Sequence, residues 1–129
     1  MKSQQIPSLT IKSLKSSPTV LLTAGLHGDE VGGMIIIQEI FKILKGHLLQ
    51  GNLYAFPLLN PVGFKNVSRY LSLEGQEDLN RLFPGKKEGT TAAKTAAEIF
   101  KMILKKKPDL ALDIHNDWRN SIPHILIDL

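Results

Sequence analysis

The stretch TVLLTAGLHGDE, residues 19–30, decides the fold class of this 129-residue chain. Residues 19–24 are a short run of β-branched and aliphatic residues that follows Pro18 and ends at Gly25, which predicts a buried strand. Asp29 and Glu30 suit the start of a helix, because acidic side chains are favoured near its free N–H groups. The stretch therefore predicts a strand followed directly by a helix.

Two helices are predicted from apolar spacing and from their end signals. The first has apolar residues at helical intervals, at positions 36, 37, 40, 41 and 44. Gly46 suits its end. The second covers about residues 92–106, with Thr90 or Thr91 as its cap and Pro108 beyond its end.

Two further strands are predicted at residues 52–56 and 110–115, and weaker strand patterns lie at residues 6–14 and 125–127. Residues 63–91 have little periodicity, and irregular segments of this length are often functional. Strands that alternate with helices predict an α/β protein, a three-layer sandwich with a mixed, mostly parallel sheet.

Composition narrows the class of protein. Apolar residues make up 43% and charged residues 22%, as in an ordinary globular domain. The net charge of +4 comes from short lysine clusters without a basic stripe, so no nucleic-acid partner is expected. No run reaches the roughly 18 apolar residues of a membrane span and no signal peptide is evident, so we expect a cytoplasmic protein without a membrane partner. The absence of cysteine excludes disulfides, thiolate ligands and thiol nucleophiles.

A metal-ligand pattern spans the predicted strand ends. His27 and Glu30 are three residues apart, a spacing that brings both side chains onto one side of a first helical turn. His115 ends a later strand, and ligands gather at the carboxyl ends of strands in such sheets. Two imidazoles and a carboxylate are normal zinc ligands, and Asp113 could orient His115. On these patterns alone, a tight turn at the glycines around His27 and a hydrogen-bonded His115 explain the residues better than a metal site does.

Several motifs, in order, resemble those of the succinylglutamate desuccinylase/aspartoacylase family within the zinc carboxypeptidase-like group. They are AGLHGDE at residues 24–30, Asn60-Pro61, Arg69-Tyr70, DLNRLFPG at residues 78–85 and DIHN at residues 113–116. The resemblance implies a zinc carboxypeptidase-like fold with Zn²⁺ as the cofactor. It also implies a hydrolase that cleaves the amide bond of an N-acyl amino acid or a related small amide.

The resemblance also implies roles for single residues. The implied zinc ligands are His27, Glu30 and His115. Asn80 and Arg81 would bind the carboxylate of a small-molecule substrate, and Arg69 would polarise the scissile carbonyl.

The arginine assignments have an alternative and an uncertainty of spacing. Without the resemblance, both arginines would be surface residues of a loop. The segment between Tyr70 and Asp78 is longer than in typical aspartoacylases, so the role of Arg69 is less secure than that of Arg81. Asp78 is expected to buttress the loop.

The general base of the family is a glutamate far downstream of the third ligand. No glutamate follows His115 here, and the carboxylates beyond it are those of Asp117 and Asp128. We therefore expect residues 1–129 to be the N-terminal, zinc-ligand-bearing part of a single catalytic domain, truncated relative to the family. A complementary chain or a homo-oligomer could complete it. The alternatives are a zinc carboxypeptidase-like peptidase and a catalytically silent metal-binding module.

Overall fold

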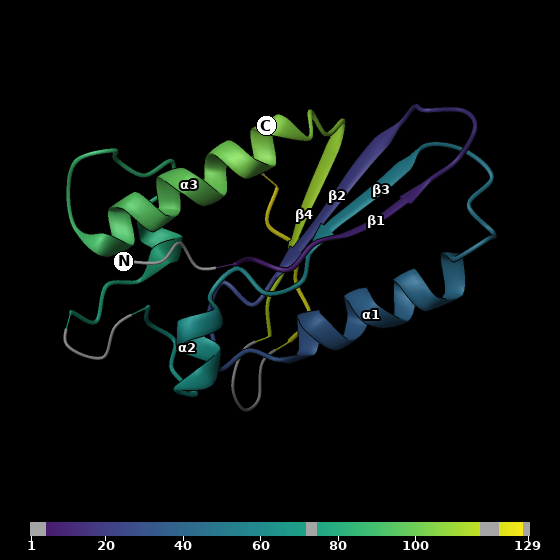
Figure 1. Cartoon of the computed structure of the whole chain (residues 1–129). Coiled ribbons are helices and arrows are strands. Elements are labelled where there is room, and N and C mark those ends of the chain that lie inside the picture. The colour runs from purple at the N-terminus through teal and green to yellow at the C-terminus, as the bar shows by residue number, and fades with distance from the viewer. Residues whose placement is uncertain (1–4, 72–74, 117–121, 128–129) are drawn as a thin grey trace.

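A four-stranded mixed sheet forms the centre of the protein (Figure 1). The computed structural model describes residues 5–71, 75–116 and 122–127. The strands are β1 (Leu9–Lys12), β2 (Thr19–Ala24), β3 (Asn52–Phe56) and β4 (Leu110–Ile114), in the order β1-β3-β2-β4. β2 is parallel to β3 and β4, while β1 is antiparallel to β3. The mostly parallel sheet is as predicted, and the weak pattern at residues 6–14 is confirmed as the edge strand β1.

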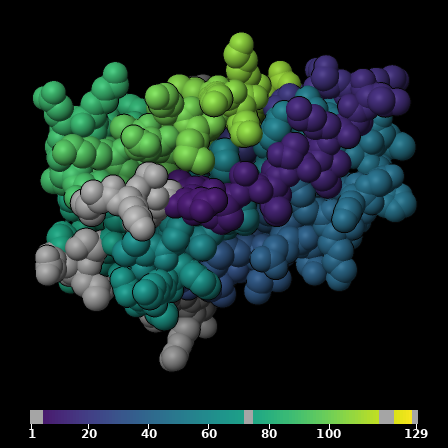
Figure 2. Space-filling view, in the orientation of Figure 1, coloured from purple at the N-terminus to yellow at the C-terminus, as the bar shows by residue number. Residues whose placement is uncertain are grey.

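Two long helices cover the two faces of this sheet, α1 (Gly32–Leu44) on one side and α3 (Thr91–Lys105) on the other (Figure 1). Successive strand side chains alternate between the faces, which divides the core in two. The core toward α1 contains the buried residues Leu22, Ala24, Ile37, Leu53 and Ala55. The core toward α3 includes the buried residues Leu21, Phe56, Ala92, Ala96 and Ile99. The three-layer sandwich is thereby confirmed. Figure 2 shows the β1 segment on the surface between the two helical layers.

The start of α1 differs from the prediction. The helix begins at Gly32 with Val31 as its cap, and its first turn contains no acidic residue. Glu30 lies before the helix because its buried carboxylate bonds to side chains outside the helix. Asn116, just after β4, supplies the missing cap: its Oδ1 accepts a hydrogen bond from the Gly32 N–H at 2.8 Å.

Two short helices lie in the segment predicted to be irregular, α2 (Pro61–Lys65) and the 3₁₀ helix η1 (Leu79–Arg81). The Asn60 side chain caps α2 by accepting from the Gly63 N–H at 2.8 Å. Pro61 occupies the first helical position, where its missing N–H has no intrahelical acceptor to lose. The Asn-Pro pair was therefore the sequence signal for this helix.

Residues 125–127 do not form the predicted strand. Their side chains are 75% to 85% exposed, so this apolar run has no surface to pack against within the described residues. β4 is the last strand described, and its outer edge pairs with no strand in the parts of the chain that the structure covers. Leu110 and Leu112 on β4 are also exposed. Among the described helices, none has the length and apolar character needed to cross a membrane.

Candidate metal centre

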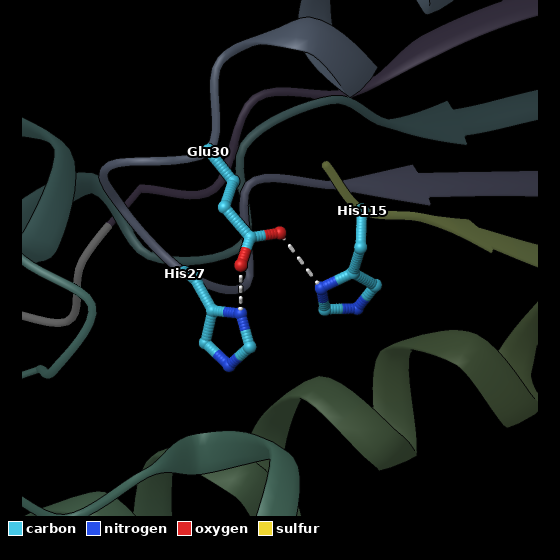
Figure 3. A group of neighbouring side chains, drawn as sticks. All are labelled: His27, Glu30 and His115. Atoms are coloured by element: carbon cyan, nitrogen blue, oxygen red, sulfur yellow. Dashed lines mark hydrogen bonds and ion pairs between the residues drawn. The ribbon is translucent and has the colours of Figure 1, made fainter. Parts of the chain in front are cut away.

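Three side chains meet beyond the carboxyl ends of β2 and β4 (Figure 3). Ala24 and Ile114, the last residues of the two strands, are register partners, so the loops that follow start at the same level of the sheet. His27 and Glu30 follow β2, and His115 directly follows β4. One potential ligand atom from each residue lies within 4.8 Å of the other two. The three residues predicted as metal ligands are therefore brought together.

Glu30 occupies the centre of this group and is only 4% exposed. Its Oε1 lies 2.6 Å from His27 Nδ1, and its Oε2 lies 3.0 Å from His115 Nδ1. The backbone N–H of Asn116 donates to the same Oε2 at 3.1 Å. A turn closed by the Glu30 N–H and the His27 carbonyl, 3.2 Å apart, brings the pair together. The predicted helical turn is thus replaced by a tighter loop.

A second carboxylate holds the far nitrogen of each histidine ring. His27 Nε2 lies 3.0 Å from Asp78 Oδ1, and His115 Nε2 lies 2.6 Å from Asp113 Oδ2. Thr23 Oγ1 donates to Asp113 Oδ1 at 2.7 Å, which anchors this carboxylate to β2. A carboxylate at Nε2 favours the tautomer that carries its proton there, leaving the Nδ1 lone pair for a cation.

The donor set fits a divalent transition metal. Two imidazole nitrogens and one carboxylate form a common three-ligand set of catalytic zinc sites, in which a fourth position stays open. His27 is 2% exposed, whereas the His115 side chain is 31% exposed, so the group is open on the His115 side. The Nδ1 atoms of both rings face Glu30 (Figure 3), which is the arrangement that a shared ion requires.

The charges of the group shift three pKa values. The hydrogen bond with Asp113 raises the pKa of His115 above its ordinary 6.5; burial opposes this, and the negative charges of Asp113 and Glu30 add to it. Burial raises the pKa of Asp78, but hydrogen bonds from His27, Arg69 and the Asn80 backbone outweigh it, so the pKa lies below 3.8. The pKa of Asp113 is lowered in the same way, because bonds with His115 and Thr23 outweigh burial.

Arg69 lies beside the group of His27, Glu30 and His115. Its Nε and Nη2 donate to Asp78 Oδ2 at 3.1 and 2.9 Å, and its Nη1 lies 3.4 Å from Glu30 Oε1. Asn80 and Arg81 lie on η1, and both residues are exposed. Asn80 also lines a cavity of about 370 Å³ between the sheet and α3, together with Thr23, Phe83, Phe100 and Asp113 among others.

Sequence reasoning missed two contacts that shape the group. It assigned Asp78 to support of its own loop, whereas Asp78 also contacts His27. It explained the glycines near His27 by a tight turn, whereas Gly28 packs against α2: a Cβ there would lie 2.0 Å from the Gly63 carbonyl carbon. The Gly28 N–H also donates to the Ser68 carbonyl at 3.0 Å. Asp117 and Asp128, the carboxylates beyond the third ligand, lie outside the described residues.

A mixed sheet between two helical layers, with a His-Glu-His group beyond its strand ends, defines an α/β protein of the zinc carboxypeptidase-like class. Residues 16–128 match the family model of the succinylglutamate desuccinylase/aspartoacylase catalytic domain. The chain belongs to this family.

Curated relatives agree with this assignment. The chain is 32% identical over 111 residues to the N-alpha-acetyl-L-2,4-diaminobutyric acid deacetylase of Halomonas elongata, covering 86% of this chain and 32% of that protein. It is 31% identical over 110 residues to a succinylglutamate desuccinylase of Pseudomonas syringae pv. tomato, covering 79% of this chain and 32% of that protein. The chain therefore spans about a third of the length of these relatives.

Solved structures resemble the fold closely. A succinylglutamate desuccinylase/aspartoacylase from Rhodobacter sphaeroides superimposes with a TM-score of 0.73 at 35% identity, covering 85% of this chain and 33% of that one. The product-bound ectoine utilization protein EutE (DoeB) from Ruegeria pomeroyi gives a TM-score of 0.69 at 35% identity, covering 84% of this chain and 32% of that one.

Proposed function

We propose that this chain carries the zinc-binding part of a deacylase that hydrolyses the amide bond of an N-acyl amino acid or a related small amide. The observation that carries this proposal is the meeting of Glu30 and His115, 85 positions apart in the sequence, with His27 at the strand ends. The names of two relatives add support, since one is called a deacetylase and the other a desuccinylase.

In this proposal, Zn²⁺ is held by His27, Glu30 and His115. When bound there, zinc supplies a Lewis acid that polarises a carbonyl and lowers the pKa of a water molecule. Asp78 and Asp113 hold the two rings by Nε2, which keeps both Nδ1 atoms turned toward Glu30. Such outer partners orient the ligands and strengthen their basicity.

Arg69, Asn80 and Arg81 are the proposed substrate-recognition residues. The Arg69 guanidinium lies beside Glu30 and Asp78, so it is close enough to the ligand group to stabilise charge that develops on an amide oxygen there. Arg81 offers a planar fork suited to a carboxylate, and Asn80 adds a donor from the same short helix. This set favours a substrate with a free carboxylate.

We further propose that residues 1–129 are the N-terminal, ligand-bearing part of a single catalytic domain. The chain spans about a third of the relatives' length. The outer edge of β4 is where further strands would continue the sheet, because no strand of the described residues pairs with it. These strands would come from more of the same protein, from a complementary chain or from a second copy.

Metal analysis with matched histidine variants tests the ligand assignment. The chain should take up stoichiometric zinc, and His27→Ala should abolish this uptake. His47→Ala is the control, because His47 is an exposed histidine beyond α1 and outside the ligand group. A clean, folded wild-type chain that takes up no zinc would refute the metal centre.

Hydrolysis assays separate the proposed activity from its alternatives. The assay uses zinc-loaded protein that contains the complete domain. Incubated with a panel of N-acetyl and N-succinyl amino acids, it should release free amino acid. Release of carboxyl-terminal residues from peptides instead would indicate a peptidase. Zinc binding without any hydrolysis by the complete domain would indicate a silent metal-binding module.

A further inference from the structure

Asp78 contacts both the metal-ligand group and the short helix η1. Its Oδ1 lies 3.0 Å from His27 Nε2 and accepts a hydrogen bond from the Asn80 backbone N–H at 2.9 Å. A single oxygen atom therefore joins the ring of a proposed metal ligand to the helix that carries the proposed carboxylate-binding residues. Leu79, fully buried in the core toward α3, fixes the first residue of η1 next to this contact.

Arg69 closes these contacts into a ring. It donates to Asp78 Oδ2 from Nη2 at 2.9 Å, and its Nη1 reaches Glu30 Oε1 at 3.4 Å. Glu30 in turn lies 2.6 Å from His27 Nδ1, and His27 returns to Asp78 through Nε2. Asp78 thus contacts one proposed metal ligand, His27, directly and a second, Glu30, through Arg69. A change in the position of Asp78 should therefore shift both side chains.

We propose that Asp78 is a positioning residue that couples metal binding at His27 to carboxylate binding by η1. This inference rests on the proposed function, since it takes His27 as a zinc ligand and Asn80 with Arg81 as the carboxylate site. If His27 used Nδ1 as a metal ligand, its ring proton would stay on Nε2, where it would hold the Asp78 carboxylate that accepts from the Asn80 N–H. A carboxylate bound to η1 orders the same contacts from the other side. Linkage requires the two effects to be equal.

Asp113 provides an internal comparison, because it makes the equivalent contact to the other histidine. It lies on β4 and is bonded to Thr23 of β2, so the sheet sets its position. Asp113 should therefore orient His115 without transmitting the state of η1. Loss of either aspartate should weaken metal binding, whereas only the loss of Asp78 should remove the coupling.

The coupling is measured as the change in zinc affinity that a carboxylate causes. Zinc dissociation constants of the full chain are obtained by competition with a chromophoric chelator, without and with saturating succinate, a dicarboxylate that has no amide bond to cleave. Asp78→Asn and Asp113→Asn should each weaken zinc binding by roughly 10–100-fold. Succinate should tighten zinc binding by about 5-fold or more in wild type and in Asp113→Asn, and leave it unchanged in Asp78→Asn.

Two further variants control for charge and for folding. Glu77→Gln removes the neighbouring carboxylate, which bonds to Thr90 rather than to the ligand group, and should retain the wild-type coupling. Asp78→Ser keeps a side-chain oxygen that can cap η1, so the short helix should still form in this variant. If the coupling is lost in Asp78→Ser, unfolding of η1 is therefore not the cause. Circular dichroism verifies that each variant is folded.

Three results would count against the inference. An equal succinate effect in wild type and Asp78→Asn would show that the coupling bypasses Asp78, for example through direct binding of succinate to the metal. If succinate left the zinc affinity of the wild type unchanged, there would be no coupling. A folded wild-type chain that binds no zinc would overturn the proposed metal centre itself, which separates that failure from the failure of the coupling.

Discussion

Gly28→Ala should damage the proposed metal centre although Gly28 is not one of the proposed ligands. An added Cβ would lie 2.0 Å from the Gly63 carbonyl carbon and 2.1 Å from the Phe64 backbone nitrogen. Contacts of a real Cβ essentially never fall under 3.0 Å, so the His27–Glu30 loop or α2 must move by about 1 Å. α2 cannot yield freely, because the Asn60 at its start is fully buried and its N–H donates to the Gly25 carbonyl at 2.9 Å.

A movement of this size is large for a metal site. Metal–ligand distances in proteins are held within about 0.2 Å, so a shift of about 1 Å in the loop would displace His27 and Glu30, two of the three proposed ligands, beyond this tolerance. We expect zinc binding to weaken by about 100-fold or more, which corresponds to about 2.8 kcal/mol. Chelator competition measures this loss, and urea denaturation of the metal-free protein shows how much of it is general destabilisation.

The matched control is Gly75→Ala, where an added Cβ would meet its nearest atoms, on the Glu77 side chain, at 3.9 Å and beyond. This variant should bind zinc like the wild type. The reasoning fails if Gly28→Ala binds zinc with wild-type affinity and unfolds at the wild-type urea concentration, because the loop would then tolerate a side chain that this packing forbids.

Three further predictions concern stability. Ile37→Ala, at a fully buried position of α1, should lower the free energy of unfolding by about 2–5 kcal/mol in urea denaturation, whereas Ile43→Ala, at a position of the same helix that is 67% exposed, should change it little. Zinc at 100 times its dissociation constant should stabilise the chain by about 2.7 kcal/mol and raise its melting temperature, and the absence of any shift would contradict specific binding to the folded state. The metal-free chain should be most stable between about pH 4 and pH 6.5. The lowered pKa values of Asp78 and Asp113 give stability that is lost as the pH falls below 3.8. The raised pKa of His115 gives stability that is lost as the pH rises above 6.5. Denaturation across this range should show both slopes, and Asp113→Asn should flatten them.

The sequence was sufficient for the layers and for the meeting of the three proposed ligands. Strand patterns placed His27 and His115 beyond two strand ends, and parallel neighbours bring such ends to one edge. Two details depended on contacts that no local pattern contains. Glu30 lies before the helix because its carboxylate bonds to two histidines, one of them 85 positions away. Asp78 turned toward His27 across 51 positions, a pairing that composition and periodicity do not record.

The apolar run at residues 125–127 is a case in which the sequence predicted a strand that does not form. Its β-branched and aliphatic residues have strand propensity, but propensity alone does not form a strand without a neighbour to pair with and a face to bury. Within the described residues neither is present, and the side chains stay exposed. The same reasoning explains why β1, which is no longer than four residues, does form: β3 gives it a paired neighbour over its whole length.

The burial of Glu30 argues for a metal more strongly than the spacing of the ligands does. A buried carboxylate is unfavourable unless cations and donors surround it, and replacing such groups by apolar ones is often neutral or stabilising. Glu30 is 4% exposed and is faced by two imidazoles, one guanidinium and one backbone N–H. The imidazoles are themselves held by Asp78 and Asp113, so the group gathers three carboxylates around two histidines and one arginine. A divalent cation held by His27, Glu30 and His115 would supply the positive charge that this arrangement favours. Metal binding therefore explains the group better than a contribution to stability does.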